Sequence, residues 1–140
     1  MSDKTFLDTN VVIYAFDHAS PEKLKVARRL ITEGAVGKHA IVSYQVVQEF
    51  VNVALLRFQA AMTELELEEF LFETLFPMTA ITSSSSLVIE ALRLRSQHSL
   101  SWYDSLILAA ALQAGCKLLF SEDFQHGRRF GDLTVQNPFL

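Results

Sequence analysis

Four acidic residues stand at places in the sequence where chemistry is expected, each beside an apolar segment. Asp8 directly ends the short apolar run Thr5 to Leu7, and Asp123 follows another apolar run near the end of the chain. Glu49 lies at the edge of the apolar face of one helical pattern, and Asp104 lies in the first turn of another. Each acid also has an ordinary explanation as a turn, cap or exposed residue, so their significance depends on whether they converge.

Four converging carboxylates would indicate a metal site. Carboxylates that crowd together repel one another, and each raises the pKa of its neighbours unless a cation neutralises them. Mg²⁺ and Mn²⁺ favour carboxylate oxygens and retained waters as ligands. One or two such ions can orient an attacking water and stabilise the leaving oxygen of a phosphodiester. The acids therefore indicate metal-assisted phosphodiester hydrolysis.

Strands and helices alternate along the chain. Strands are predicted at Thr5 to Leu7, Ala40 to Val42, Met78 to Thr82, Lys117 to Phe120 and Leu133 to Val135. Helices are predicted at Val11 to Phe16, Pro21 to Gly34, Tyr44 to Phe58, Thr63 to Leu75, Leu87 to Leu94 and Ser101 to Gly115. This alternation predicts an α/β fold with a mainly parallel sheet and helices on both faces. In such a sheet the strand ends, and the acids after them, meet along one edge.

Polar residues and helix breakers mark the predicted helix boundaries. Ser43 and the serines at 83–86 are expected to cap helices, and Thr63 with Glu66 forms a capping-box pair. Gly34 is expected to end the second helix, and the fourth is expected to end before Pro77. No linker or repeat divides the chain, so residues 1–140 are expected to form a single domain.

Two charged helix faces each have two readings. Basic residues on the second helix form either a solvated face or a patch that contacts phosphates; they are Lys23, Lys25, Arg28 and Arg29. Acidic residues on the fourth helix form either a plain surface or a face for a partner protein; they are Glu64, Glu68, Glu69 and Glu73. The sequence leaves both choices open.

The composition is that of a soluble domain with a well-filled core. The 140 residues are 50% hydrophobic and carry a formal net charge of −4, and the mean hydropathy is +0.23. An apolar association surface is therefore expected. The lone Cys116 excludes an internal disulfide and suggests a reducing compartment, and the longest apolar run, Leu106 to Leu112, is too short to span a membrane. A cytoplasmic protein is expected.

Several other catalytic patterns are absent from the sequence. No glycine-rich loop ends in Gly-Lys-Ser or Gly-Lys-Thr, no Gly-x-Ser-x-Gly elbow occurs, and no cysteines and histidines have zinc-like spacing. His126 is close in sequence to Asp123, Arg128 and Arg129, which makes contact with a substrate conceivable. An exposed surface position is the expectation we favour for His126.

Ordered motifs along the whole chain form a pattern that resembles a known family. They are Phe-Leu-Asp-Thr-Asn-Val-Val-Ile (Phe6 to Ile13), Val-Val-Gln-Glu-Phe (Val46 to Phe50), Trp-Tyr-Asp-Ser-Leu-Ile-Leu-Ala-Ala-Ala (Trp102 to Ala111), Leu-Phe-Ser-Glu-Asp-Phe-Gln-His-Gly (Leu119 to Gly127) and a closing Asn-Pro-Phe (Asn137 to Phe139). The chain resembles the PIN-domain ribonucleases, and most closely the VapC-type toxins of bacterial toxin-antitoxin pairs. The resemblance implies a three-layer α/β/α PIN-like fold and an endoribonuclease that depends on Mg²⁺ or Mn²⁺. It also implies a homodimer that a cognate antitoxin inhibits.

The resemblance also assigns roles to individual residues. The family's acidic metal-binding positions match Asp8, Glu49, Asp104 and Asp123. Ser121 matches a supporting hydroxyl before the last acid, and Asn10 matches a polar residue beside the first. The hypothesis is that Asp8, Asp104 and Glu49 hold a principal ion, while Asp123 completes that site or a second one. Glu122 adds a neighbouring acid, and Asp123 is taken as the ligand with that choice open.

Two competing functions remain. A phosphohydrolase could use Asp8 as a nucleophile, although that chemistry usually requires a second acid at the position of Asn10. A non-catalytic PIN-fold module could instead use the acidic pocket to receive a basic segment of a partner. The RNA that is cut is not predicted, because the sequence contains no base-reading motif. The identity of the antitoxin is not predicted by the sequence either.

Overall fold

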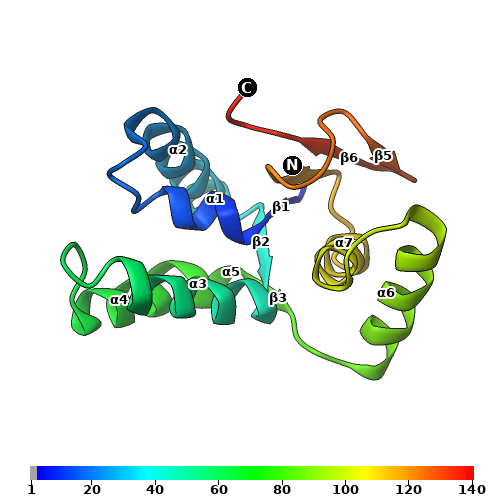
Figure 1. Ribbon diagram of the computed structural model, residues 1–140, viewed down its shortest axis with the longest axis horizontal. Helices are drawn as coiled ribbons and strands as arrows, with labels where there is room; N and C mark the ends of the chain where they lie inside the picture. Colours follow the sequence, from blue (N-terminus) through cyan, green and yellow to red (C-terminus); the bar gives the residue numbers. More distant parts are fainter. Residues whose placement is uncertain (1–2) are drawn as a thin grey trace.

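A six-stranded sheet with the order β3-β2-β1-β4-β6-β5 forms the centre of the computed structural model, which describes residues 3–140 (Figure 1). The strands are β1 (Thr5–Leu7), β2 (Ala40–Ser43), β3 (Thr79–Ile81), β4 (Leu118–Phe120), β5 (Arg129–Phe130) and β6 (Leu133–Gln136). All neighbouring strands are parallel except β5, which is antiparallel to β6. The predicted mainly parallel sheet is therefore confirmed.

Helices cover both faces of this sheet. They are α1 (Thr9–Tyr14), α2 (Pro21–Gly37), α3 (Tyr44–Arg57), α4 (Glu64–Phe70), the π-helical η1 (Leu71–Leu75), α5 (Phe76–Met78), α6 (Ser85–His98) and α7 (Trp102–Gln113). Figure 1 shows α1 to α5 on one side of the sheet and α6 and α7 on the other. The three-layer α/β/α architecture is thus confirmed.

The order of the strands creates a switch point between β1 and β4. From β1 the chain moves outward to β2 and β3, and it then returns to place β4 on the other side of β1. The amide of Asp8 donates a hydrogen bond to the carbonyl of Phe120 over 3.0 Å, which joins the ends of β1 and β4. Ligands of open α/β sheets bind in the crevice at such a point.

The core is formed by strands that are buried along their length and by a helix that is apolar nearly all round. Phe6 and Leu119, at the centres of β1 and β4, are fully buried. In α7 the buried residues include the whole run 107–111, which matches a helix packed between a sheet and a second helix. No helix within residues 3–140 has the length and apolarity that crossing a membrane requires.

The prediction that Gly34 ends the second helix is wrong. Helix α2 continues to Gly37, and Lys38 follows in the left-handed conformation with φ of 55°. A Cβ atom at position 34 would lie 2.3 Å from the Cβ of Ala40 in β2. Gly34 is therefore a packing residue, because only glycine lets the helix approach the strand this closely.

The prediction that the fourth helix ends before Pro77 is also wrong. Helical backbone continues from α4 through η1 into α5, which contains Pro77. The amide of Phe76 donates to the carbonyl of Leu71, five residues earlier, which makes the wider turn of a π-helix. Proline clashes with the preceding turn of a regular helix, and the wider turn accommodates it.

The predicted caps are confirmed at the starts of several helices. Ser84 accepts a hydrogen bond from the amide of Leu87, and Thr63 and Glu66 make both bonds of a capping box at 3.1 Å.

Strand β5 is absent from the sequence prediction. Its two residues are too few to show a pattern, and pairing with β6 rather than local preference makes it a strand.

Candidate metal centre

Asp8 occupies the deepest position of the candidate site. Strand β1 ends at Leu7, and Asp8 follows as the N-cap of α1 with only 3% of its surface exposed. Its Oδ1 accepts a hydrogen bond from the amide of Thr9 over 2.7 Å, and its Oδ2 accepts one from the Ser121 hydroxyl over 2.6 Å. Two neighbouring segments therefore fix both oxygens of this buried carboxyl group.

Glu49 is tied to the same corner through Thr9. The Thr9 hydroxyl donates to Glu49 Oε1 over 2.9 Å, and Gln45 Nε2 donates to the same oxygen over 3.3 Å. Sequence reasoning missed both Thr9 and Gln45. Gln45 precedes Glu49 by four residues on α3, and that spacing places two side chains on one helix face, which could have indicated the pair.

Asp104 approaches the site from the first turn of α7. Its amide donates to the Ser101 hydroxyl over 3.2 Å, which confirms Ser101 as the helix cap. Its side chain is partly buried. Gln45 Nε2 also lies 3.4 Å from the carbonyl oxygen of Tyr103, so one side chain of α3 contacts both Glu49 and the start of α7.

Ser121 links Asp123 to Asp8. It is fully buried directly after β4, and its hydroxyl accepts a hydrogen bond from the Asp123 amide over 3.0 Å while it donates to Asp8. Asp123 itself is exposed. The short turn after β4 therefore holds one acid at the rim of the site and stabilises another at its base.

Glu122 is engaged by a different set of side chains. Lys23 Nζ lies 2.7 Å from Glu122 Oε2, and the Tyr14 hydroxyl donates to Glu122 Oε1 over 2.7 Å. Burial would raise the pKa of Glu122, but the hydrogen bonds from Lys23 and Tyr14 outweigh it, so the pKa is lowered. Since Lys23 pairs with an acid, it is not a free cation of a phosphate-contacting patch.

Asn10, two residues after Asp8 in α1, contacts the turn that carries Glu122 and Asp123. Its Oδ1 accepts a hydrogen bond from the Glu122 amide over 3.4 Å. Its Nδ2 is buried and has no hydrogen-bond partner among the residues that the structure describes. A buried donor without a partner is costly, so this amide group is suited to bind an oxygen that enters the site.

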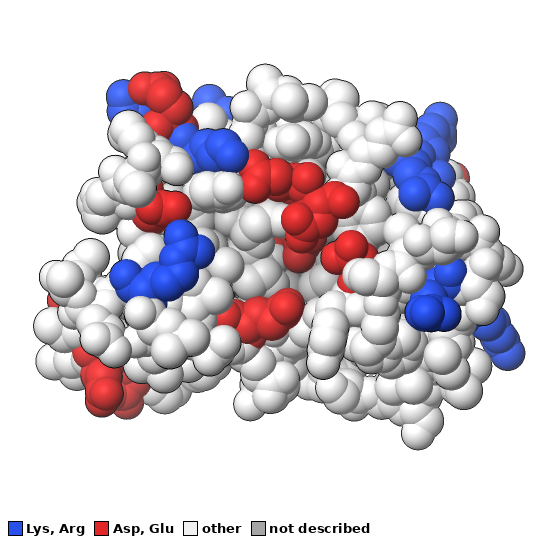
Figure 2. Space-filling model, viewed as in Figure 1, with Lys and Arg blue, Asp and Glu red and all other residues white. Residues whose placement is uncertain are grey.

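The electrostatics indicate an excess of negative charge. Burial, together with the charges of Asp123 and Asp104, raises the pKa of Asp8 to about 7 despite the hydrogen bonds from Ser121 and Thr9. Burial and the charge of Asp123 also raise the pKa of Asp104. Figure 2 shows acidic side chains gathered over the middle of the face that carries the switch point, with basic ones toward its sides.

The donor set fits a hard divalent cation that keeps part of its water shell. The four predicted positions supply carboxylate oxygens alone, which Mg²⁺ and Mn²⁺ favour. Within residues 3–140, no three acidic, histidine or cysteine side chains are close enough together to surround an ion by themselves. A cation would therefore need waters to complete its coordination, as Mg²⁺ usually does.

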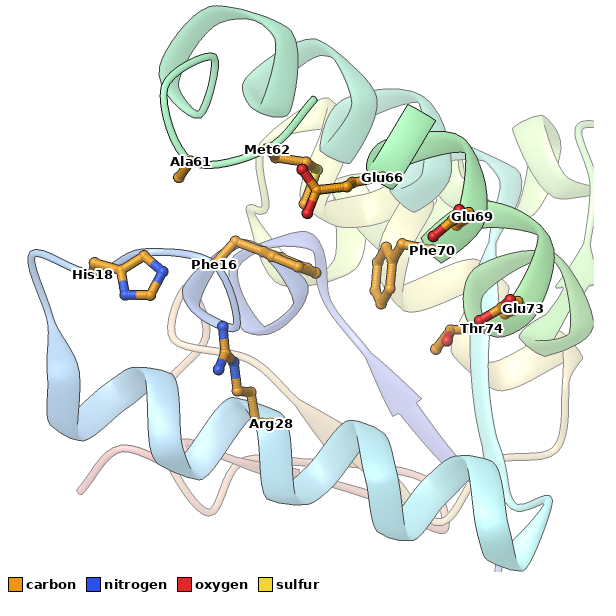
Figure 3. A pocket seen from close by; sticks show the side chains of 10 residues that line it. All are labelled: Phe16, His18, Arg28, Ala61, Met62, Glu66, Glu69, Phe70, Glu73 and Thr74. Carbon is orange, nitrogen blue, oxygen red and sulfur yellow. The ribbon is translucent and has the colours of Figure 1, made fainter. Parts of the chain in front are cut away.

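A separate cleft lies between α2 and the α4–η1 segment (Figure 3). It has a volume of about 340 Å³. Figure 3 shows Phe16 and Phe70 between its walls, with Arg28 on one side and Glu66 and Glu69 on the other. This cleft, which we call the α2–α4 cleft, combines an aromatic base with an acidic wall.

His126 is an exposed residue, as expected. Its Nδ1 accepts a hydrogen bond from the amide of Asn137 over 3.0 Å, so it holds the C-terminal segment. Arg28 likewise has a structural contact, because its Nε donates to the carbonyl of Ala15 over 2.7 Å. Both side chains thus have local roles in the fold.

Comparison with known proteins identifies one matching family. The sequence model of the PIN domain matches residues 5–129, which include every residue of the candidate site. No curated protein matches the chain.

Proposed function

Because the chain belongs to the PIN-domain family, a nuclease-type fold, we propose that it is a metal-dependent endoribonuclease that hydrolyses RNA phosphodiester bonds. The observation that carries this proposal is the buried Asp8 at the switch point, whose pKa is raised by burial and by the acids Asp123 and Asp104. Such a carboxyl group is neutralised either by a proton or by a bound cation, and a cation would allow Asp8 to stay ionised at neutral pH.

Each residue of the site has a role in this proposal. Asp8, Glu49 and Asp104 would contribute to binding the principal ion, directly or through waters that the ion retains, and Asp123 would complete that site or a second one. A bound Mg²⁺ or Mn²⁺ supplies Lewis-acid stabilisation of the negative charge that develops on the phosphate. The engagement of Glu122 by Lys23 supports Asp123 as the ligand of the two neighbours.

The supporting side chains orient these acids and the substrate. Ser121 and Thr9 fix the oxygens of Asp8, and Thr9 also positions Glu49. The partnerless Nδ2 of Asn10 donates to an oxygen of the phosphate or of the attacking water. One of the four carboxylates would accept a proton from that water.

Incubation of the purified chain with total RNA tests the activity. We expect cut ends at defined positions in the presence of Mg²⁺ or Mn²⁺ and none in excess EDTA, because the carboxylates alone cannot stabilise the developing charge. Sequencing of the new ends measures the result. Metal binding without cleavage of any RNA would favour a binding module, and a phosphate trapped covalently on Asp8 would favour a phosphohydrolase.

We further propose that the chain is the toxin of a type II toxin-antitoxin pair and acts in the cytoplasm. The α2–α4 cleft supports an inhibitory protein partner, because aromatic side chains and an acidic wall together suit a basic amphipathic segment.

The lone Cys116 supports the cytoplasmic location. It is buried, and burial raises the pKa of its thiol to about 11, which suits a structural role in a reducing compartment.

Charge reversal in the α2–α4 cleft tests the antitoxin proposal. We expect Glu69→Lys with Glu73→Lys to weaken binding of the protein encoded beside this chain by about 100-fold, because the introduced lysines would repel its basic segment. Titration calorimetry measures the affinity. Glu68→Lys is the matched control, since Glu68 is exposed on the same helix but does not line the cleft. Equal affinity of the double variant and the control would contradict this docking surface.

A homodimer is also proposed. Exposed apolar side chains on α3 and on the segment after α4 support it, and they include Leu55, Phe72 and Phe76. Leu55 and Phe76 line one shallow hollow of about 400 Å³ together with Val51 and Leu71. Apolar surface of this kind is typical of an interface between subunits.

A further inference from the structure

A small cavity lies between the start of α3, the segment after β3, and α7, close to the candidate metal centre. Its volume is about 160 Å³. Its lining includes Tyr44, Gln45, Gln48, Thr82 and Tyr103, and none of the side chains that line it is charged. We call it the tyrosine cavity.

We infer that the tyrosine cavity binds one unpaired base of a single-stranded RNA substrate next to the scissile phosphate. The inference rests on the proposed ribonuclease function and adds a position at which the enzyme distinguishes bases. Sequence-specific recognition of RNA targets single-stranded bases, which stack on aromatic rings and hydrogen-bond through their edges.

The two tyrosines supply surfaces for stacking. Tyr103 is 65% exposed and Tyr44 is 45% exposed, and both line the cavity. Tyr44 and Gln48 also border the hollow proposed for the homodimer, whereas Tyr103 does not, so Tyr103 is the principal stacking ring. Neither ring packs against another aromatic ring within residues 3–140. Exposed aromatic rings without partners can stack on bases, and such stacking contributes strongly to binding of single strands.

The polar lining supplies groups that can contact base edges. Gln48 and Thr82 carry amide and hydroxyl groups that are donors and acceptors, and both are exposed. Because no lysine or arginine lines the cavity, it does not suit a phosphate, which would need positive charge. The cavity is therefore matched to the neutral part of a nucleotide.

Gln45 places the cavity directly beside the acids. It lines the cavity, and its Nε2 is within hydrogen-bond distance of both Glu49 Oε1 and the carbonyl of Tyr103. Tyr103 immediately precedes Asp104, so both walls of the cavity carry a residue next to a proposed ligand. A base held here would therefore lie beside the proposed metal ligands.

Binding of single-stranded RNA oligonucleotides tests the inference. A series is prepared in which each oligonucleotide lacks the base at one position, and binding to the full chain in EDTA is measured by fluorescence anisotropy. We expect loss of one base to weaken binding to the parent chain by about 10-fold. Tyr103→Ala should abolish the effect at that position only, and Tyr103→Phe should retain it because the ring remains.

The possible results separate the inference from the proposed function. If the parent chain cuts total RNA but Tyr103→Ala leaves both the abasic pattern and the cut sites unchanged, the cavity does not bind a base. Failure of the parent chain to bind or cut RNA would overturn both proposals. A change in oligomeric state with Tyr103→Ala, seen by analytical ultracentrifugation, would instead assign this surface to a contact between subunits and overturn the inference.

Discussion

Replacing Asp104 with Asn is expected to lower kcat/KM for RNA cleavage by on the order of 10³-fold or more. The substitution keeps the size of the side chain but removes the negative charge that a divalent cation requires. Asp104 lies at the start of α7 and is coupled electrostatically to Asp123, so its loss removes one wall of the proposed site. Cleavage of a defined RNA by the purified variant measures the effect.

The same substitution should leave the fold intact. The helix cap uses the backbone amide of residue 104, which donates to Ser101 in either variant. Burial already raises the pKa of the Asp104 carboxyl, so a neutral side chain is tolerated there. Asp132→Asn is the control, because it removes the same charge from an exposed residue between β5 and β6 that is not part of the proposed site. If Asp104→Asn cut RNA as fast as the parent chain, the assignment of Asp104 would be wrong.

The metal-free protein is expected to lose stability as the pH rises from about 4 to about 7. Burial raises the pKa of Asp8 from 3.8 to about 7 in the folded state. Between these values the folded chain keeps a proton that the unfolded chain has released, so the free energy of unfolding falls with pH. The full contribution of Asp8 is about 4 kcal/mol at most, and it no longer changes above pH 7 or below pH 4.

Denaturant unfolding in EDTA at several pH values, for the parent chain and Asp8→Asn, measures this contribution. The variant cannot ionise at position 8, so the difference in unfolding free energy between the two proteins isolates Asp8 from all other groups. The variant should be the more stable protein at pH 7 and above. Mg²⁺ or Mn²⁺ should stabilise the parent chain there and have little effect on the variant. A difference that stays constant with pH would contradict the prediction.

The sequence predicted the layered fold because the relevant signals are local and periodic. Each strand that reaches the site ends at a polar residue, and β1 with Asp8 shows this most clearly. The motifs around Asp8, Glu49, Asp104 and Asp123 resembled the PIN-domain ribonucleases, and the family match over residues 5–129 confirms the family. The toxin role, the metal and the roles of the individual acids stay predictions.

The contacts that organise the site could not be read from local patterns. Thr9 meets Glu49 across 40 residues, and Lys23 meets Glu122 across 99 residues. The role of Gly34 was equally hidden. Glycine is needed there because α2 packs closely against Ala40 on β2, a contact that the local sequence does not reveal. Local patterns place the elements, whereas the pairing of side chains depends on how the elements pack.

The hydrogen bond between Ser121 and Asp8 also has a consequence for synthesis of the chain. These residues are separated by 113 positions, and β1 reaches its partner β4 only after the intervening elements exist. Since the chain emerges from the ribosome in order, Asp8 is made early and waits for the turn after β4. We therefore expect that a nascent chain cannot cut RNA until residues 118–123 have emerged, so the proposed toxin stays harmless to its own ribosome during most of translation.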